Sequence, residues 1–334
     1  MLKDIEKSKP EDKERLNREI RTYRDQLFGM LQSMREKKLP VLVLLEGWAA
    51  AGKGSLIKEL ISEIDPRFYN VVSPAVIPES ESRYPFMYPY ACAIPENGKI
   101  MFLDSGWMES LVRKYIRREI TDDEYKKRIR SINEFERQLR DGGYIILKLF
   151  LHIDREEQLE RLESLYGTPE TRWRVTEDDL WQNREYSRFF KAYDEVMEKT
   201  DKSVKWHILD ARKRKTAIRD ALELLTSRID SALRKGRYTG DVYEADFPVI
   251  PMPLLKDVDL SPTISEEDYK HELKRYQARL SELHNKIYEK KIPVILCYEG
   301  WDAAGKGGNI RRVAYPLDPR GLTCIRLHPR FRMN

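Results

Sequence analysis

Two stretches of this chain carry nearly the same twenty residues: EKKLPVLVLLEGWAAAGKGS at 36–55 and EKKIPVILCYEGWDAAGKGG at 289–308. Thirteen of the twenty positions are identical, at a constant offset of 253 residues. The triplets DPR at 65–67 and 318–320 extend the match at the same offset. Because solenoid repeats recur every ~20–50 residues, a period of this length indicates a duplicated domain.

Each stretch has the pattern of a phosphate-binding loop. An apolar run leads into GxxxxGK, and a helical pattern follows. In such loops the backbone N–H groups converge on an anion, and the helix N-terminus adds partial positive charge. Both copies place glycine where the Walker pattern has its magnesium-binding Ser or Thr. The predicted phosphate-binding residues are Gly47, Gly52, Lys53, Gly54 and Ser55 in the first loop, and Gly300, Gly305, Lys306, Gly307 and Gly308 in the second.

The two loops differ at one informative position, which is Ala49 in the first and Asp302 in the second. A carboxylate inside a phosphate loop repels phosphate unless a metal or a proton in transfer compensates for its charge. We therefore interpret Asp302 as a sign of catalysis in the second copy, and Ala49 as a sign of its loss in the first. A purely structural glycine turn is the alternative, and two copies between a strand and a helix argue against it.

The residues between the two loops alternate between strand and helix patterns. Apolar runs of strand length lie at 41–45, 70–77, 99–104, 144–151 and 204–209, and helical patterns lie at 53–64, 108–118, 122–140, 155–166, 177–199 and 211–235. This alternation predicts an α/β fold, a P-loop kinase-like parallel sheet with helices on both faces and a helical lid, whose second copy is truncated. The expected domains are an N-terminal helix at 1–38, a first P-loop domain at 39–235, a proline-rich linker at 236–264 and the start of a second domain at 265–334.

Two further features of the first copy bear on phosphate chemistry. Asp104 ends the strand pattern at 99–104, where it is either a Walker-B-type magnesium ligand or a helix cap. The segment 168–191 interleaves cations with tryptophan, and Arg172 and Arg174 are expected to form a lid that closes over the phosphates. Arg184 and Arg188, four residues apart, equally fit the solvated face of a helix.

Composition and charge restrict the class of protein only loosely. The formal net charge of +5 permits a polyanionic partner without demanding one. The three cysteines are widely spaced, which favours a reducing compartment over a disulfide framework or a zinc site. The N-terminus is charged, and no apolar run approaches the ~20 residues of a membrane span. We expect a cytoplasmic protein.

The segment EGWDAAGKGG at 299–308 resembles the phosphate loop of the polyphosphate kinase 2 family, including its loop aspartate, here Asp302. Segments of the first copy are similar to the same family: Pro78-Glu79, the strand ending at Asp104 with Trp107, Phe135-Glu136-Arg137, and Arg172-Trp173-Arg174. The resemblance covers 11–235 as one full domain and 265–323 as the start of a second.

The resemblance implies phosphoryl transfer between inorganic polyphosphate and nucleotides with Mg²⁺. Tandem members resemble polyphosphate:AMP phosphotransferases, in which the second domain carries the chemistry. By resemblance, Asp302 would position the metal and help activate AMP, and Lys306 with the loop amides would hold the phosphates. Asp104, from its place at the end of a strand, is the candidate metal residue of the first copy. The partners implied are polyphosphate and AMP or ADP, without nucleic acid or membrane. A homo-oligomer is compatible with the sequence.

The sequence departs from the family pattern after Gly321, where it reads LTCIRLHPRFRMN and stops. The family continues with a Walker-B strand and a basic lid, which carry metal binding and charge stabilisation. We therefore expect a truncated or frameshifted product with weak or no activity alone, and residues 292–334 that are poorly ordered or held by the first domain. The alternatives are a non-catalytic polyphosphate- or nucleotide-binding and dimerising module, and a generic nucleoside kinase.

Overall fold

The computed structural model describes residues 1–2, 12–73, 84–235, 255–318 and 324, which fall into two compact units. Unit 1 comprises 1–78 and 84–244, and unit 2 comprises 79–83 and 245–334. Most of the predicted linker, residues 236–254, lies outside the described residues. The domain limits at 38, 235 and 264 therefore stay predictions, and the two units are described one at a time.

Unit 1 is built on a five-stranded parallel sheet, as the sequence predicted. Its strands are β1 (Val41–Gly47), β2 (Tyr69–Val72), β3 (Ile100–Asp104), β4 (Ile145–His152) and β5 (Trp206–Asp210), in the order β2-β3-β1-β4-β5. β1 lies in the middle with every residue buried. Its neighbours β3 and β4 extend the sheet in opposite directions, so the end of β1 is the switch point where open α/β sheets bind ligands.

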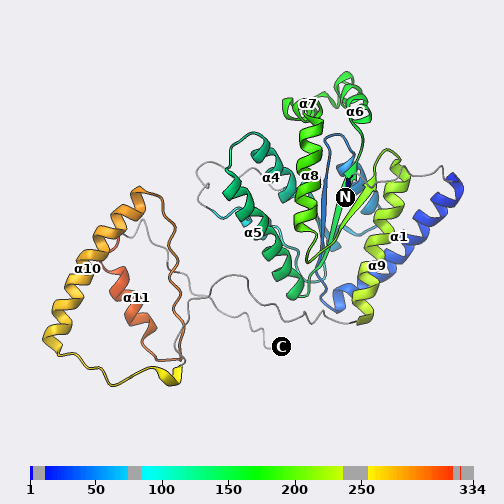
Figure 1. The fold of residues 1–334 in the computed structure, drawn as a ribbon. Helices are drawn as coiled ribbons and strands as arrows, with labels where there is room; N and C mark the ends of the chain where they lie inside the picture. Colours follow the sequence, from blue (N-terminus) through cyan, green and yellow to red (C-terminus); the bar gives the residue numbers. More distant parts are fainter. Residues whose placement is uncertain (3–11, 74–83, 236–254, 319–323, 325–334) are drawn as a thin grey trace. The chain divides into compact units, whose positions relative to one another are not determined.

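Helices cover both faces of this sheet (Figure 1). On one face α1 (Lys13–Glu36) lies beside α9 (Arg214–Lys235), with α2 (Lys53–Leu60) next to α9. On the other face lie α4 (Trp107–Ile116), α5 (Asp122–Asp141) and α8 (Tyr186–Thr200). The short elements are η2 (Pro66–Phe68), α3 (Tyr88–Ala91) and η5 (Leu255–Asp257). The buried residues of α1 recur at helical spacing, so this helix packs through one apolar stripe.

The lid region consists of α6 (Arg155–Gly167), the 3₁₀ turn η4 (Arg172–Arg174) and α7 (Glu177–Arg184). The predicted single helix at 177–199 is wrong, because the chain leaves helical geometry at Glu185 and continues as α8. The two helices bury different surfaces: α7 turns its glutamine and asparagine towards the β1–α2 loop, whereas α8 packs aromatic residues on the sheet. Arg184 and Arg188 therefore lie on separate helices and form no i,i+4 pair on one face.

Unit 2 repeats the opening elements of unit 1 at the same offset of 253 residues. α10 (Glu266–Glu289) has the limits of α1, and α11 (Lys306–Ala314) begins at the position equivalent to the start of α2. The strand expected before the second loop is absent from the described residues 292–300. A central strand needs hydrogen-bonded neighbours on both sides, and the described part of unit 2 contains no equivalents of β3 or β4.

Among the helices that the structure describes, none has the length and apolar composition needed to cross a bilayer. The cysteines in the same residues, Cys92, Cys297 and Cys324, are free and exposed.

Candidate phosphate-binding site

The first loop turns sharply between β1 and α2. Gly47 has φ 144° and Gly52 has φ 95°, both in the region that favours glycine, and Ala50 adopts φ 58°. A Cβ atom at Gly47 would lie 2.5 Å from the carbonyl oxygen of Leu151 on β4. Glycine is therefore required at the end of β1, because the loop packs directly against the neighbouring strand.

The lysine of the first loop folds back across the turn. Lys53 is the first residue of α2, and its Nζ donates to the carbonyl oxygens of Gly47 and Trp48, both at 3.3 Å. In the sheet, Leu45 near the end of β1 pairs with Asp104 at the end of β3, which brings Asp104 beside the loop. A Cβ atom built on Gly54 would lie 3.8 Å from Oδ2 of Asp104. Asp104 therefore lies next to the loop 47–54 in space.

Asp104 does not cap the following helix, so the cap interpretation is wrong. The N-cap residue of α4 is Gly106, and the carboxylate of Glu46 on β1 accepts hydrogen bonds from the N–H groups of Gly106 (3.1 Å), Met108 (2.8 Å) and Glu109 (3.3 Å). Complete burial, together with the nearby charge of Glu109, raises the pKa of Glu46 to about 8. This contact was not predicted from the sequence, although the glutamate recurs in both loop copies.

A second acidic side chain lies beside Lys53. Burial by itself would raise the pKa of Glu109, but the charges of Lys53 and Arg113 outweigh it and lower that pKa. Burial raises the pKa of Asp104, and the charge of Glu109 acts in the same direction while Lys53 opposes it. Oε2 of Glu109 is buried without a hydrogen-bond partner in the described structure. An acceptor oxygen next to the loop is thus left without a donor.

The tryptophan of the first loop is fixed by aromatic packing. Trp48 is fully buried and stacks on Tyr186 of α8, with ring centroids 3.9 Å apart. Its indole N–H donates to Nδ1 of His152 at 3.2 Å. From α6, the guanidinium of Arg161 donates to the carbonyl oxygens of Ala50 and Ala51. These side chains hold the loop against α8, β4 and α6.

The lid cations predicted from the sequence lie on η4. Arg172 donates from Nε to the carbonyl oxygen of Tyr166 at 2.9 Å, and its guanidinium lies over the Tyr166 ring. Arg174 lies over the ring of Trp173, whose side chain is 74% exposed. Within the described residues, no hydrogen bond or ion pair joins either arginine to the first loop. Both are exposed to solvent, so they can meet an anion that approaches from outside.

A different contact anchors the lid to the body of unit 1. Asp178 of α7 forms ion pairs with Arg113 and Arg117, which lie one turn apart on α4. Burial opposes the ionised form, but the two guanidinium groups lower the pKa of Asp178. The ring of Trp181, also on α7, lies under Arg117. This anchoring was not foreseen from the sequence, since the partners are more than sixty residues apart.

The second loop has the backbone geometry of the first. Gly300 has φ 153°, Ala303 has φ 59° and Gly305 has φ 84°, close to the values at the equivalent positions 47, 50 and 52. Nζ of Lys306 donates to the carbonyl oxygens of Gly300 and Trp301, both at 2.7 Å. This is the pattern that Lys53 makes in unit 1. The backbone thus forms the turn here although no strand flanks it in the described residues.

Asp302 is exposed, as are the glycines that follow the loop lysine, Gly307 and Gly308. The part of the chain that the structure describes contains no group of three or more His, Cys, Asp or Glu placed to hold a metal ion. Mg²⁺ is commonly held by one or two carboxylates together with phosphate oxygens and water. The donor oxygens of Asp104, with the partnerless oxygen of Glu109 nearby, and of Asp302 fit that requirement.

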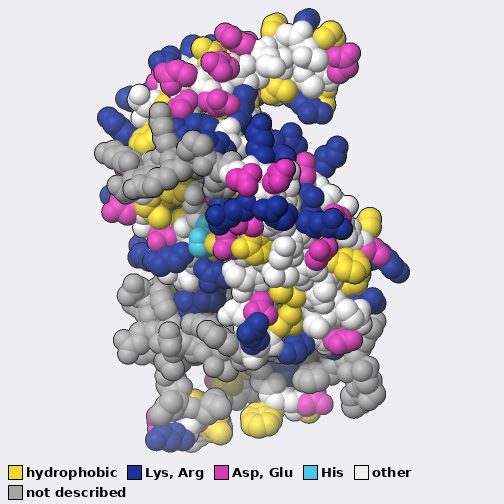
Figure 2. Space-filling model, turned by 90° about the vertical axis from the view of Figure 1, so that its right-hand side faces the viewer, with side chains coloured by type: hydrophobic (Ala, Val, Ile, Leu, Met, Phe, Trp, Pro, Cys, Tyr) yellow, Lys and Arg dark blue, Asp and Glu magenta, His cyan; other side chains and the backbone are white. Residues whose placement is uncertain are grey.

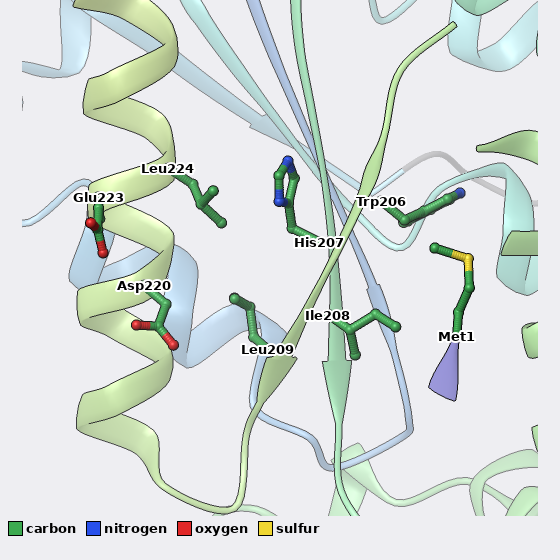
Figure 3. A pocket seen from close by; sticks show the side chains of 8 residues that line it. All are labelled: Met1, Trp206, His207, Ile208, Leu209, Asp220, Glu223 and Leu224. Carbon is green, nitrogen blue, oxygen red and sulfur yellow. The ribbon is translucent and has the colours of Figure 1, made fainter. Parts of the chain in front are cut away.

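An open hollow on the surface of unit 1 along β5 is a separate feature. This cavity of about 460 Å³ lies between the edge strand and α9 and is lined by residues such as His207, Asp220 and Glu223 (Figure 3). None of the predicted phosphate-binding residues lines it. The space-filling view shows Lys and Arg interspersed with Asp and Glu, in keeping with a small net charge (Figure 2). Neither feature points to a second anion site.

Comparison with known proteins finds similar sequences along most of the chain. A family model described as polyphosphate kinase 2 matches residues 10–237 and 263–329. The chain is 30% identical over 297 residues to a polyphosphate:AMP phosphotransferase of Pseudomonas syringae pv. tomato, covering 87% of this chain and 59% of that protein. It is 27% identical to a protein of the same name from Pseudomonas aeruginosa, covering 92% and 63%. The chain thus spans about three fifths of the length of these relatives.

Solved structures give the same fold. The crystal structure of a polyphosphate kinase 2 from Arthrobacter aurescens TC1 matches with a TM-score of 0.66 at 21% identity, covering 75% of this chain and 89% of that one. At this level of identity the match concerns the fold alone. It supports the α/β sheet with helices on both faces.

Proposed function

Because the chain belongs to the polyphosphate kinase 2 family, we propose that it binds inorganic polyphosphate and an adenine nucleotide and transfers a phosphoryl group from polyphosphate to AMP, forming ADP. The observation that carries this proposal is the second loop, where an acidic side chain stands in a turn with phosphate-loop geometry. The names of the two Pseudomonas relatives support AMP as the acceptor.

The proposed reaction needs little covalent chemistry from the protein. A phosphate oxygen of AMP attacks the terminal phosphorus of polyphosphate, a new P–O bond forms, and the bond to the bridging oxygen breaks, leaving polyphosphate one unit shorter. Catalysis then consists of positioning and charge stabilisation. The loop amides and Lys306 would stabilise negative charge on the transferred group, and Asp302 would orient the acceptor phosphate.

Mg²⁺ is proposed as the cofactor, held by Asp302 in the second loop and by Asp104 in the first. When bound, it supplies positive charge to the phosphate oxygens, which otherwise meet the carboxylate of Asp302 at close range. Arg172 and Arg174 are proposed as lid cations that shield the phosphates from water. A cytoplasmic location and a homo-oligomeric assembly remain predictions.

A pair of loop variants tests the assignment. ADP formation from AMP and polyphosphate with Mg²⁺ would be measured for the full chain, for Lys306→Ala and for Lys53→Ala. We expect Lys306→Ala to abolish turnover and Lys53→Ala to keep most of it. Turnover lost only in Lys53→Ala would move the chemistry to the first loop. ADP formation indistinguishable from a blank without protein would overturn the catalytic proposal for this chain.

The second candidate function is a non-catalytic module that binds polyphosphate or nucleotide. It is favoured by Ala49, which removes the acidic group from the one loop that lies in a complete sheet. Ala49→Asp separates the two candidates. Polyphosphate-dependent ADP formation in this variant indicates a lapsed enzyme, whereas binding of polyphosphate without turnover supports the module.

A further inference from the structure

The backbone amide of Ala49 in the first loop is already occupied by a side chain. Its N–H donates to Oε1 of Gln182 at 2.8 Å, across 133 residues of sequence. In a phosphate loop the backbone N–H groups are the donors that receive the anion. An amide that is bonded to Gln182 cannot donate to a phosphate oxygen at the same time.

Gln182 belongs to a network that we call the glutamine latch, formed by Gln158 of α6 with Gln182 and Asn183 of α7. Nε2 of Gln158 donates to Oε1 of Gln182 at 2.8 Å and to the carbonyl oxygen of Ala49 at 3.3 Å. Asn183 donates from Nδ2 to Oε1 of Gln158 at 3.0 Å. The N–H and the C=O of Ala49 are therefore both hydrogen-bonded to side chains of the lid helices α6 and α7.

The latch is buried, and several hydrogen bonds join its members. Gln158 is 0% exposed and Gln182 is 1% exposed. Nε2 of Gln182 donates to the hydroxyl of Tyr193 at 2.9 Å, which fixes the orientation of the amide with its oxygen towards Ala49. A buried hydrogen-bonded network of this kind is costly to break, because each lost bond leaves a polar group without a partner.

The second loop differs at the equivalent position. There Asp302 is exposed, and in the described part of unit 2 no side chain forms a hydrogen bond with it. In the first loop the latch lies at Ala49, the position at which the two loops differ in sequence. Loss of the acidic residue and capture of the amide occur together in the first loop.

We propose that Gln182 is a positioning residue that withholds the Ala49 amide from anions, so that the first loop binds polyphosphate weakly while the latch is closed. Because its members lie on α6 and α7, the latch also joins the lid helices to the loop. The latch acts at the first loop whether or not the second loop transfers phosphoryl groups. It therefore goes beyond the proposed function and is testable without turnover.

Deuterium exchange resolved to peptides containing residues 47–54 tests this directly, with tripolyphosphate as the probe. In the full chain the Ala49 amide should exchange slowly, because its acceptor is buried. In Gln182→Leu it should exchange faster. The tripolyphosphate concentration that half-protects this peptide should fall about tenfold, the effect of one additional hydrogen bond to a charged group.

The variant Gln182→Glu keeps an acceptor oxygen for Ala49, and it should retain slow exchange without the gain in anion affinity. Gln138→Leu is the matched control, since it removes an exposed glutamine on α5 that bonds only within its own helix. Protection of the β4 peptide reports that unit 1 remains folded, and Gln182→Met serves as a second variant should leucine unfold it. Faster exchange with an unchanged tripolyphosphate midpoint, or slow exchange in Gln182→Leu, would overturn the proposal.

Discussion

At the scale of single residues, the two loops have similar backbone geometry but carry alanine in one and aspartate in the other at the same position. Asp302 and Ala49 occupy equivalent turns, and the lysines that follow make equivalent bonds to backbone carbonyls. The sequence was sufficient to predict these turns, because GxxxxGK places its glycines at the positions where φ is positive. The capture of Ala49 by Gln182 could not be predicted, since nothing local marks Gln182 as its partner.

Replacing Asp302 with asparagine should lower kcat for polyphosphate-dependent ADP formation by about 10²-fold or more, because the variant keeps the shape of the loop and loses the charge that orients the acceptor and the metal. Steady-state kinetics would measure it. Asp257→Asn, at an exposed aspartate elsewhere in unit 2, is the control. Equal kcat in the two variants would contradict a catalytic role for Asp302.

The glycines that open the two loops should differ in their tolerance of a side chain. Gly47→Ala places a methyl group 2.5 Å from a backbone oxygen of β4 and should lower the free energy of unfolding by more than about 3 kcal/mol. At Gly300 the nearest atom to such a methyl group is 3.8 Å away, so the clash is absent. Thermal melts followed by circular dichroism would compare the pair, and equal midpoints would argue against close packing of Gly47 on β4.

At the scale of elements, two long-range contacts beside the first site both involve α4. Glu46 of β1 binds the N-terminus of α4, and Asp178 of α7 pairs with arginines on α4. The sequence predicted a strand at β1 and a helix at α4, but it joined α7 and α8 into one helix. It did not predict the contacts, because nothing in the sequence near Glu46 or Asp178 shows which distant groups these side chains meet.

Glu46 should make the stability of unit 1 depend on pH. In the unfolded chain this carboxyl titrates near 4.5, and in the folded chain its pKa is about 8. Its stabilising contribution is therefore complete below pH 4.5 and is lost as the pH rises through 8, because the folded state retains the proton. Urea unfolding between pH 5 and 8 should show a loss of a few kcal/mol that is smaller in Glu46→Gln. An unchanged slope in the variant would exclude Glu46 as the source.

The two arginines of η4 should behave differently. Arg174→Ala should raise the KM for polyphosphate severalfold and leave kcat nearly unchanged, because its guanidinium makes no hydrogen bond to the described backbone and can meet an anion. Arg172→Ala should raise the KM as well and, in addition, raise deuterium uptake across 166–174, since it also removes a bond to the Tyr166 carbonyl. Identical effects of both variants on KM and exchange would contradict this division.

At the scale of the whole molecule, the chain combines one complete sheet with a second unit that repeats only its opening elements in the described residues. The apolar run before the second loop is exposed: Val294 is 56% exposed, Ile295 86% and Leu296 63%. In unit 1 the equivalent residues form the buried central strand. An exposed apolar run with unpaired backbone groups is a site for association.

The full chain should therefore associate with itself in a concentration-dependent way at micromolar concentrations. Leu296→Lys should weaken that association, because a charge is placed within the apolar run. Analytical ultracentrifugation would measure it, with Leu260→Lys as a control at a residue that is exposed outside the run. Association that is equally strong in both variants would place the contact elsewhere.

The sequence by itself determined the duplication, the five parallel strands and the two glycine turns, because these follow from apolar spacing and from glycine at fixed offsets along a short stretch of chain. The tertiary structure alone decided that Glu46 rather than Asp104 caps α4, that Glu185 separates α7 from α8, and that Gln182 holds the Ala49 amide. It also decided that residues 292–300 form no strand in the described unit. The physical reason is that each of these outcomes depends on a neighbour distant in sequence, or on its absence, and local pattern carries no record of which side chains meet across the fold.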